Sequence, residues 1–374
     1  MTPSPHGIYL HLPLCKRRCS YCDFYSRTAT ADTAAEIAEG LRREMSLRPA
    51  VAGRTLYLGG GTPNLLSAEE LSGLVILARR RYNLSECAEV SMEANPSANH
   101  SVDYFTALRQ AGVNRLSVGF QSFIPAELKL LGRLHGAEET SIFTNARRAG
   151  IGSLSIDLIY GLPGQRPNQF RQSLEQALRL GVDHLSLYAL KLEQGTPLQH
   201  EVAAGRVAEP DSDAAADCYL LALELLEREG FEQYEISNFA RPGHHCQHNV
   251  GYWRVEPFIG LGPSAVGDDG TVRRRNLPDL DGWLSALRAV ENCPHEDEAI
   301  TDEERKAEQV MLALRMREGI SEEEFSARWG LPLLGQFPAL VSHLEAGRLL
   351  REDGRLRIAK EYQLISDRIL SDLF

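Results

Sequence analysis

Residues 15–22 read Cys-Lys-Arg-Arg-Cys-Ser-Tyr-Cys and place three cysteines in the spacing C-x3-C-x2-C. The stretch follows an apolar run at residues 7–13, which has the length of a short buried strand and ends at a proline. Three thiolates this close repel one another unless a cation neutralises them. The spacing therefore favours a bound metal or cluster in a loop after the first strand.

The number of thiols narrows the choice of metal. A structural zinc site usually takes four ligands, and no fourth Cys or His follows at zinc-finger spacing. A [4Fe–4S] cluster normally takes four cysteines, so three would leave one iron open to a small molecule. The alternatives are a disulfide with a spare thiol, or three ordinary thiols, although close triplets rarely arise without a shared ligand.

The cysteine motif resembles the signature of the radical SAM superfamily. This resemblance implies that Cys15, Cys19 and Cys22 hold a [4Fe–4S] cluster whose open iron binds S-adenosylmethionine. It also implies that the cluster gives one electron to the sulfonium, so that a 5′-deoxyadenosyl radical forms. Tyr21 matches the aromatic position that packs near the adenine.

Composition limits the class of protein. The chain has 374 residues, 43% of them hydrophobic, which allows one large domain and a smaller one. We expect a cytosolic protein, because the sequence has no apolar run long enough to span a membrane and no signal peptide pattern at residues 1–5. Seven cysteines, three of them clustered, suit a reducing compartment. The net charge of −11 argues against nucleic acid as a partner and disfavours a tRNA-modifying radical enzyme.

The first half of the chain alternates between strand and helix patterns. Strands are predicted at residues 7–13, 55–58, 88–93, 115–121, 154–160 and 184–188, and helices at 33–47, 67–81, 102–111, 138–149 and 168–180. Strands that alternate with amphipathic helices indicate parallel βα units. The run is too short for an eight-unit barrel, so we predict an α/β fold with an open partial (β/α)6 barrel, as the superfamily resemblance also implies.

Polar residues stand at the predicted strand ends, where parallel α/β barrels collect their function. Glu93, Gln121 and Asp157 lie at or near the ends of the third, fourth and fifth strands. A carboxylate is costly to bury there without a partner. The alternative is that each is a solvated loop residue or a structural cap.

Three glycines, residues 59–61, end the second strand and precede Thr62. Without Cβ atoms, the backbone can press close to a ligand and offer its N–H groups, although tight turns also use glycine runs. The turn resembles the motif with which radical SAM proteins bind the amino group of S-adenosylmethionine.

A further helix is predicted at residues 211–229. The amino-acid composition of the chain changes after it. Residues 241–253 are rich in histidine and aromatic residues, and the proline and glycine at their start predict a loop. His244, His245, Cys246 and His248 could bind a metal, or the segment could be a surface loop with ordinary histidines.

The order His248-Asn249-x-x-Tyr252-Trp253 resembles the HNxxYW motif of the heme chaperone HemW family. Phe24 also supports this resemblance, because it stands where the true oxygen-independent coproporphyrinogen III oxidases carry a fourth cysteine. The resemblance covers nearly the whole chain. It implies a protein that binds heme and transfers it to acceptor proteins. Coproporphyrinogen III oxidase activity is the alternative, and Phe24 speaks against it.

The resemblance also implies the cofactors and their residues. The cofactors are a [4Fe–4S] cluster, S-adenosylmethionine and heme. Arg133 could pair with the methionyl carboxylate or with Glu93. His248 is the implied heme ligand, with Cys246 as the competing one. The residues implied to contact S-adenosylmethionine are Tyr9, Tyr21, Gly60, Gly61, Thr62, Glu93, Gln121, Arg133 and Asp157.

The implied partners are heme-accepting proteins and an electron donor for the cluster. A peripheral membrane association and a homodimer are left open.

The domain prediction has three parts: a radical SAM core at residues 1–235, a linker carrying the HNxxYW motif at 236–300, and a C-terminal domain at 301–374. The linker includes a glycine-bearing turn at 258–265. Helices at 303–317, 321–329 and 333–346, then strands at 349–351 and 356–358 around Asp353-Gly354, predict a small α+β, winged-helix-like domain. Its many acidic residues disfavour DNA binding.

Overall fold

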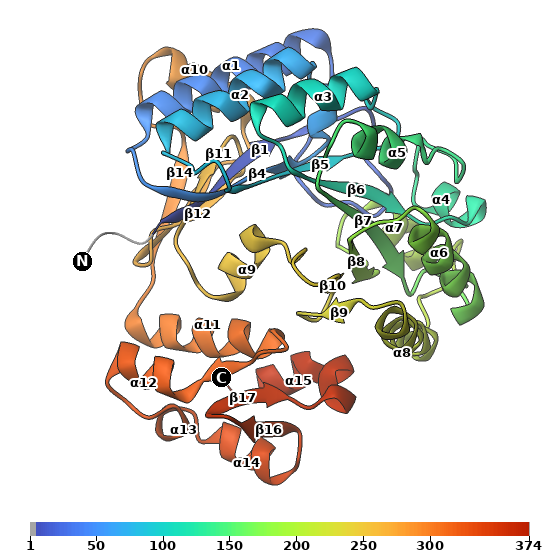
Figure 1. Ribbon diagram of the computed structural model, residues 1–374, viewed down its shortest axis with the longest axis vertical. Coiled ribbons are helices and arrows are strands. Elements are labelled where there is room, and N and C mark those ends of the chain that lie inside the picture. Colours follow the sequence, from blue (N-terminus) through green and yellow to red (C-terminus); the bar gives the residue numbers. More distant parts are fainter. Residues whose placement is uncertain (1–4, 374) are drawn as a thin grey trace.

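The structure, a computed structural model, describes residues 5–373 (Figure 1). Its centre is a curved sheet in which six strands pair in parallel, in chain order. The predicted partial (β/α)6 barrel is therefore confirmed. These strands are β1 (His6–Leu12), β4 (Gly53–Gly60), β5 (Glu89–Ala94), β6 (Arg115–Gln121), β7 (Ser153–Tyr160) and β8 (His184–Ala189).

Helices cover the convex face of the sheet (Figure 1). They are α1 (Ala31–Leu47), α2 (Ala68–Arg81), α3 (Val102–Ala111), α4 (Pro125–Leu130), α5 (Ser141–Arg148), α6 (Pro167–Arg179) and α8 (Ser212–Arg228). The helix predicted at residues 67–81 is confirmed as α2, and Ser67 and Glu70 form a capping box at its start. The helix predicted from residue 138 instead begins at Ser141, because the Glu139 carboxylate accepts the Gly136 N–H at 2.7 Å and holds a turn there.

Strand alternation separates the core from the concave face. In β1, Ile8, Leu10 and Leu12 are fully buried against the helices, whereas Tyr9 and His11 alternate with them. The same alternation in the other strands gives a hydrophobic layer outside and a polar concave face inside. The concave face is where a ligand can be held.

Residues 236–300 are more ordered than the predicted linker. Together with the short strand β9 (Glu232–Gln233), they lengthen both edges of the main sheet to twelve strands. β11 pairs in parallel with β1, whereas β12, β13 and β14 continue antiparallel. The elements are β10 (Asn238–Ala240), α9 (Gln247–Trp253), β11 (Phe258–Leu261), β12 (Val266–Asp268), β13 (Val272–Asn276), α10 (Leu280–Arg288) and β14 (His295–Ala299).

The prediction of a loop at residues 241–253 is wrong from Gln247 onwards, where α9 begins. The Glu89 carboxylate accepts the N–H groups of Gln247 at 2.9 Å and His248 at 3.0 Å, and so caps this helix. The cap comes from a strand 158 residues away in sequence, so no local pattern could reveal it.

The predicted winged-helix-like domain is confirmed. It consists of α11 (Asp302–Arg315), α12 (Glu322–Trp329), α13 (Leu333–Gln336), α14 (Ala339–Glu345), α15 (Ser366–Ser371) and a sheet of β15 (Ile320–Ser321), β17 (Arg355–Ile358) and β16 (Leu349–Glu352). Asp353 and Gly354 both have positive φ, as the predicted hairpin turn requires. The helix predicted at 333–346 is wrong in its middle, where Pro338 separates α13 from α14.

This domain lies opposite the concave face of the sheet, with α9 between the two (Figure 1). Buried ions join it to the large domain. Asp268 of β12 accepts two hydrogen bonds from Arg305 Nη2 of α11, at 2.9 and 3.1 Å. Glu308 of α11 accepts from Arg305 at 3.0 Å and from Arg273 of β13 at 2.7 Å. No helix in residues 5–373 is long and apolar enough to cross a membrane.

Candidate functional site

The cysteine loop follows β1 and leans on the segment after α4. The Ser20 amide donates to the Leu131 carbonyl at 3.1 Å, and the Ser20 hydroxyl donates to the Leu130 carbonyl at 2.6 Å. Two other hydrogen-bond donors lie close to cysteine sulfurs of the loop. Arg133 Nη1 lies 3.4 Å from Cys19 Sγ, and Thr62 Oγ1 lies 3.9 Å from Cys15 Sγ.

These surroundings fit an anionic iron–sulfur cluster. N–H and O–H donors aimed at cysteine sulfurs stabilise the negative charge that a thiolate-held cluster carries. Within residues 5–373, no three His, Cys, Asp or Glu side chains converge as the ligands of a single metal ion would. A cubane cluster spreads its cysteines over different irons, so three such sulfurs do not need to converge.

The glycine turn after β4 is tightly enclosed. Gly60 has φ +103°, and a Cβ there would run into the imidazole of His11. A Cβ on Gly61 would lie 2.5 Å from the Leu14 carbonyl oxygen, one residue before Cys15. The turn can therefore take this path beside the cysteine loop only with glycine.

Gly60→Ala should weaken S-adenosylmethionine binding by about ten-fold or more, because a left-handed alanine is strained and pushes on His11. Titration calorimetry on cluster-loaded protein measures this affinity. Gly73→Ala is the matched control, since a Cβ there meets only the end of Arg42, at 3.6 Å. Equal affinity in the two variants would remove the turn from the cofactor site.

Glu93 connects this turn to the concave face. Its carboxylate accepts the Gly60 N–H at 2.9 Å and the Tyr57 hydroxyl at 3.0 Å. Burial raises the pKa of Glu93 to about 7, and the nearby Asp157 adds to this effect. The Gly60 amide is thus held by Glu93, and the carboxylate can keep or release a proton near neutral pH.

Gln121, Arg133 and Asp157 lie further along the same face. Gln121 has φ +76°. Its buried Oε1 has no hydrogen-bond partner among the described residues, which is expected of a group that binds a ligand. Arg133 bonds to the Gly119 carbonyl and Cys19, and within residues 5–373 it forms no ion pair with Glu93. Asp157 accepts from Ser117 at 3.0 Å, and burial raises its pKa. Tyr21 packs beside Leu131.

His248 is linked to these concave-face residues through Tyr57. The His248 and Tyr57 rings stack, with their centroids 5.0 Å apart. Its Nδ1 lies 2.8 Å from the Thr55 hydroxyl and its Nε2 lies 2.7 Å from the Tyr252 hydroxyl. Burial lowers the pKa of His248 to about 3, so the ring is neutral at physiological pH. Both nitrogens are occupied, so Nε2 can bind iron only after Tyr252 releases it.

Cys246 is a weaker candidate ligand. It lies at the start of α9, buried, with Sγ 3.6 Å from Glu89. Burial raises the pKa of this thiol to about 12, which disfavours the thiolate that binds metal.

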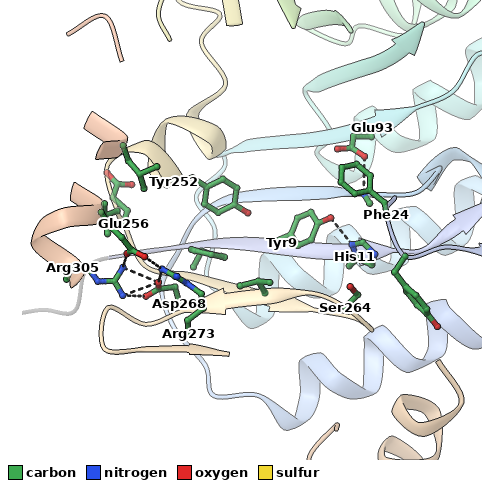
Figure 2. Close-up of a pocket in the computed structure, with 17 residues that line it drawn as sticks. Tyr9, His11, Phe24, Glu93, Tyr252, Glu256, Ser264, Asp268, Arg273 and Arg305 are labelled. Carbon is green, nitrogen blue, oxygen red and sulfur yellow. Dashed lines mark hydrogen bonds and ion pairs between the residues drawn. The ribbon is translucent and has the colours of Figure 1, made fainter. Parts of the chain in front are cut away.

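A cavity of about 520 Å³ runs from Phe24 and Tyr25, just after the cysteine loop, to α11 of the C-terminal domain. Figure 2 shows Phe24 and Glu93 at one end, Tyr9 and His11 in the middle, and Asp268, Arg273 and Arg305 at the other end. Tyr252 also lines it, so the side chain that holds His248 Nε2 faces this space. The cavity therefore connects the expected cofactor site with the HNxxYW helix.

Sequence reasoning missed several of these residues. Thr55 and Tyr57 had a usable signal, since they alternate with the buried Leu56 and Leu58 and so belong to the concave face with Tyr9. The ion network of Asp268 and Arg305 had no usable signal in the sequence, because these residues lie 37 positions apart on different elements.

The parallel sheet, the cysteine loop after β1 and the glycine turn after β4 define a radical SAM protein. Residues 9–177 match the model of the radical SAM superfamily, and residues 300–361 match that of the HemN C-terminal domain. The heme chaperone HemW of Bacillus subtilis is 33% identical over 97% of both chains, and that of Escherichia coli is 35% identical over 87% of both. The chain belongs to the heme chaperone HemW family.

A solved structure has the same fold. Coproporphyrinogen III oxidase (HemN) from Escherichia coli, described as a radical SAM enzyme, matches with a TM-score of 0.86. The match covers 100% of this chain and 91% of that chain, at 23% sequence identity. At that identity, the likeness establishes the fold and leaves the activity to other arguments.

Proposed function

We propose that this protein binds heme in the cytoplasm and transfers it to acceptor proteins, on a scaffold that also holds a [4Fe–4S] cluster and S-adenosylmethionine. The observation that carries the proposal is the 33–37% identity to heme chaperones over most of the chain. Radical SAM membership implies the cluster and S-adenosylmethionine. Cys15, Cys19 and Cys22 would hold the cluster, which supplies one-electron reduction of the sulfonium when bound.

The chain's own residues would hold S-adenosylmethionine at the strand ends. The turn at Gly60 and Gly61 packs closely against His11 and Leu14 beside the cysteine loop, where the ligand would lie, and Glu93 offers a carboxylate to its amino group. Gln121 Oε1 supplies an acceptor that lacks a partner among the described residues. Arg133 supplies positive charge beside Cys19.

Heme would enter the cavity that Tyr252 lines. A volume of about 520 Å³ is in the usual range for sites that hold large organic ligands, roughly 300–1,000 Å³. The Tyr252 hydroxyl turns away and frees His248 Nε2 for the iron. The low pKa of His248 keeps its imidazole unprotonated, which is the form that binds iron.

The alternative function, oxidation of coproporphyrinogen III, has less support. Phe24 takes the place of the fourth cysteine of the oxidases, and this residue is 64% exposed at the wall of the cavity. An aromatic ring there suits contact with a flat ligand.

Heme titration followed by the Soret band tests this assignment. We expect His248→Ala to weaken heme binding by about ten-fold or more, because an iron ligand is lost. Tyr252→Phe is the matched variant, because it keeps the ring, frees Nε2 and should retain or strengthen binding. Cys246→Ser should leave the spectrum unchanged. Heme binding that depends on Cys246 and not on His248 would reverse the two roles.

A further inference from the structure

The side chain of His248 lies over a row of residues that crosses three neighbouring strands of the main sheet. Gly7 of β1 pairs in register with Thr55 of β4, and Thr55 pairs in register with Glu89 of β5. Residues that pair in register across parallel strands belong to the same face of the sheet, here the concave face. The row therefore forms the surface on which the first turn of α9 rests.

Each residue of the row contacts His248 in a different way. A Cβ at Gly7 would lie 3.3 Å from His248 Cε1, so glycine leaves the imidazole room to lie close to the sheet. The Glu89 carboxylate accepts the backbone N–H of His248 at 3.0 Å. The Thr55 hydroxyl lies 2.8 Å from His248 Nδ1. With Tyr57 stacked on its face, the imidazole is held in one orientation.

The contact between Thr55 and Nδ1 is shielded from solvent. Thr55 and His248 are each 2% exposed, so water does not readily replace a lost hydrogen-bond partner there. Iron that binds Nε2 takes the lone pair of that nitrogen, so the ring proton stays on Nδ1. Thr55 Oγ1 is the acceptor within reach of this proton. Because bound iron draws electron density from the ring, Nδ1–H becomes a stronger donor, and this hydrogen bond is stronger with heme than without it.

We propose that Thr55 is a positioning residue for heme binding: its hydroxyl accepts Nδ1–H of His248, directs Nε2 toward Tyr252 at the cavity wall, and strengthens the bond from Nε2 to iron. The inference rests on the proposed function, because it takes His248 as the iron ligand. Ferric iron carries more charge than ferrous iron and polarises the imidazole more strongly. The Thr55 hydrogen bond therefore stabilises ferric heme more than ferrous heme and lowers the midpoint potential of the bound heme.

The test titrates ferric heme into full-length, cluster-loaded protein and follows the Soret band. Thr55→Val keeps the shape of the side chain but removes the hydroxyl, and should raise the dissociation constant about ten-fold or more. Thr55→Ser keeps the hydroxyl and should bind heme nearly as the wild type does. The midpoint potential of the bound heme should rise in Thr55→Val alone. Loosened packing would instead admit water, which stabilises the ferric charge and lowers the potential, so the sign separates the two causes.

The matched control is Thr106→Val, since this hydroxyl donates to the Val102 carbonyl at 2.8 Å within α3. Its heme affinity and midpoint potential should equal those of the wild type. Equal affinity in Thr55→Val and this control, an equal loss in Thr55→Ser, or a potential that stays or falls in Thr55→Val would overturn the inference alone, provided that His248→Ala loses heme. Wild-type heme binding by His248→Ala would overturn the proposed iron ligand and this inference with it.

Discussion

Replacing Cys15, Cys19 or Cys22 with alanine should abolish the iron–sulfur cluster. Anaerobic reconstitution of the wild-type chain should load about four irons, and each variant should lose most of this iron and its brown colour. The reason is geometric: the three sulfurs come from one short loop, and no further cysteine of the described chain lies beside it as a replacement.

Cys87→Ala is the matched control, since Cys87 is exposed and lies outside the loop. Its iron content should equal that of the wild type. Cys218 and Cys293 should also be dispensable for the cluster, although both are buried and their removal leaves space in the core. Intact iron in any of the three loop variants would contradict the assignment.

Asp268→Asn should weaken the attachment of the C-terminal domain to the large domain and lower the free energy of unfolding. Asp268 and Arg305 are 5% and 3% exposed, and the substitution leaves the guanidinium with Glu308 as its remaining acidic partner. Removing one partner of a buried pair typically costs about 3–5 kcal/mol. Because Glu308 still pairs with Arg305, we expect a loss of about 3 kcal/mol here. Urea unfolding followed by tryptophan fluorescence measures the change.

Asp297→Asn is the control for this variant. Asp297 pairs with Arg274 on the surface of the added strands, where solvent screens the charges, so its unfolding midpoint should stay near that of the wild type. A midpoint for Asp268→Asn that matches this control would show that the buried network does not hold the domain in place.

The sequence predicted the barrel well because its signals are local. Strand ends, the capping box at Ser67 and the left-handed turn at Asp353 each depend on residues a few positions apart. The cysteine loop, the glycine turn and Glu93 were also found from their places at strand ends.

Features made by distant residues could not be predicted in this way. The start of α9 depends on Glu89, and the cavity wall depends on the meeting of Asp268 with Arg305. The motif at His248 was found by resemblance, but its environment was not. Thr55 and Tyr252 occupy both ring nitrogens, and only the folded arrangement of β4 and α9 brings them together.

Heme transfer and porphyrinogen oxidation, measured side by side, distinguish the chaperone from the oxidase most directly. Cluster-loaded protein is charged with heme and mixed with apomyoglobin as the heme acceptor, and a second sample receives coproporphyrinogen III, S-adenosylmethionine and a reductant. We expect heme to pass to apomyoglobin and no protoporphyrinogen to form. Formation of protoporphyrinogen, with no heme retained or released, would contradict this expectation and favour the oxidase.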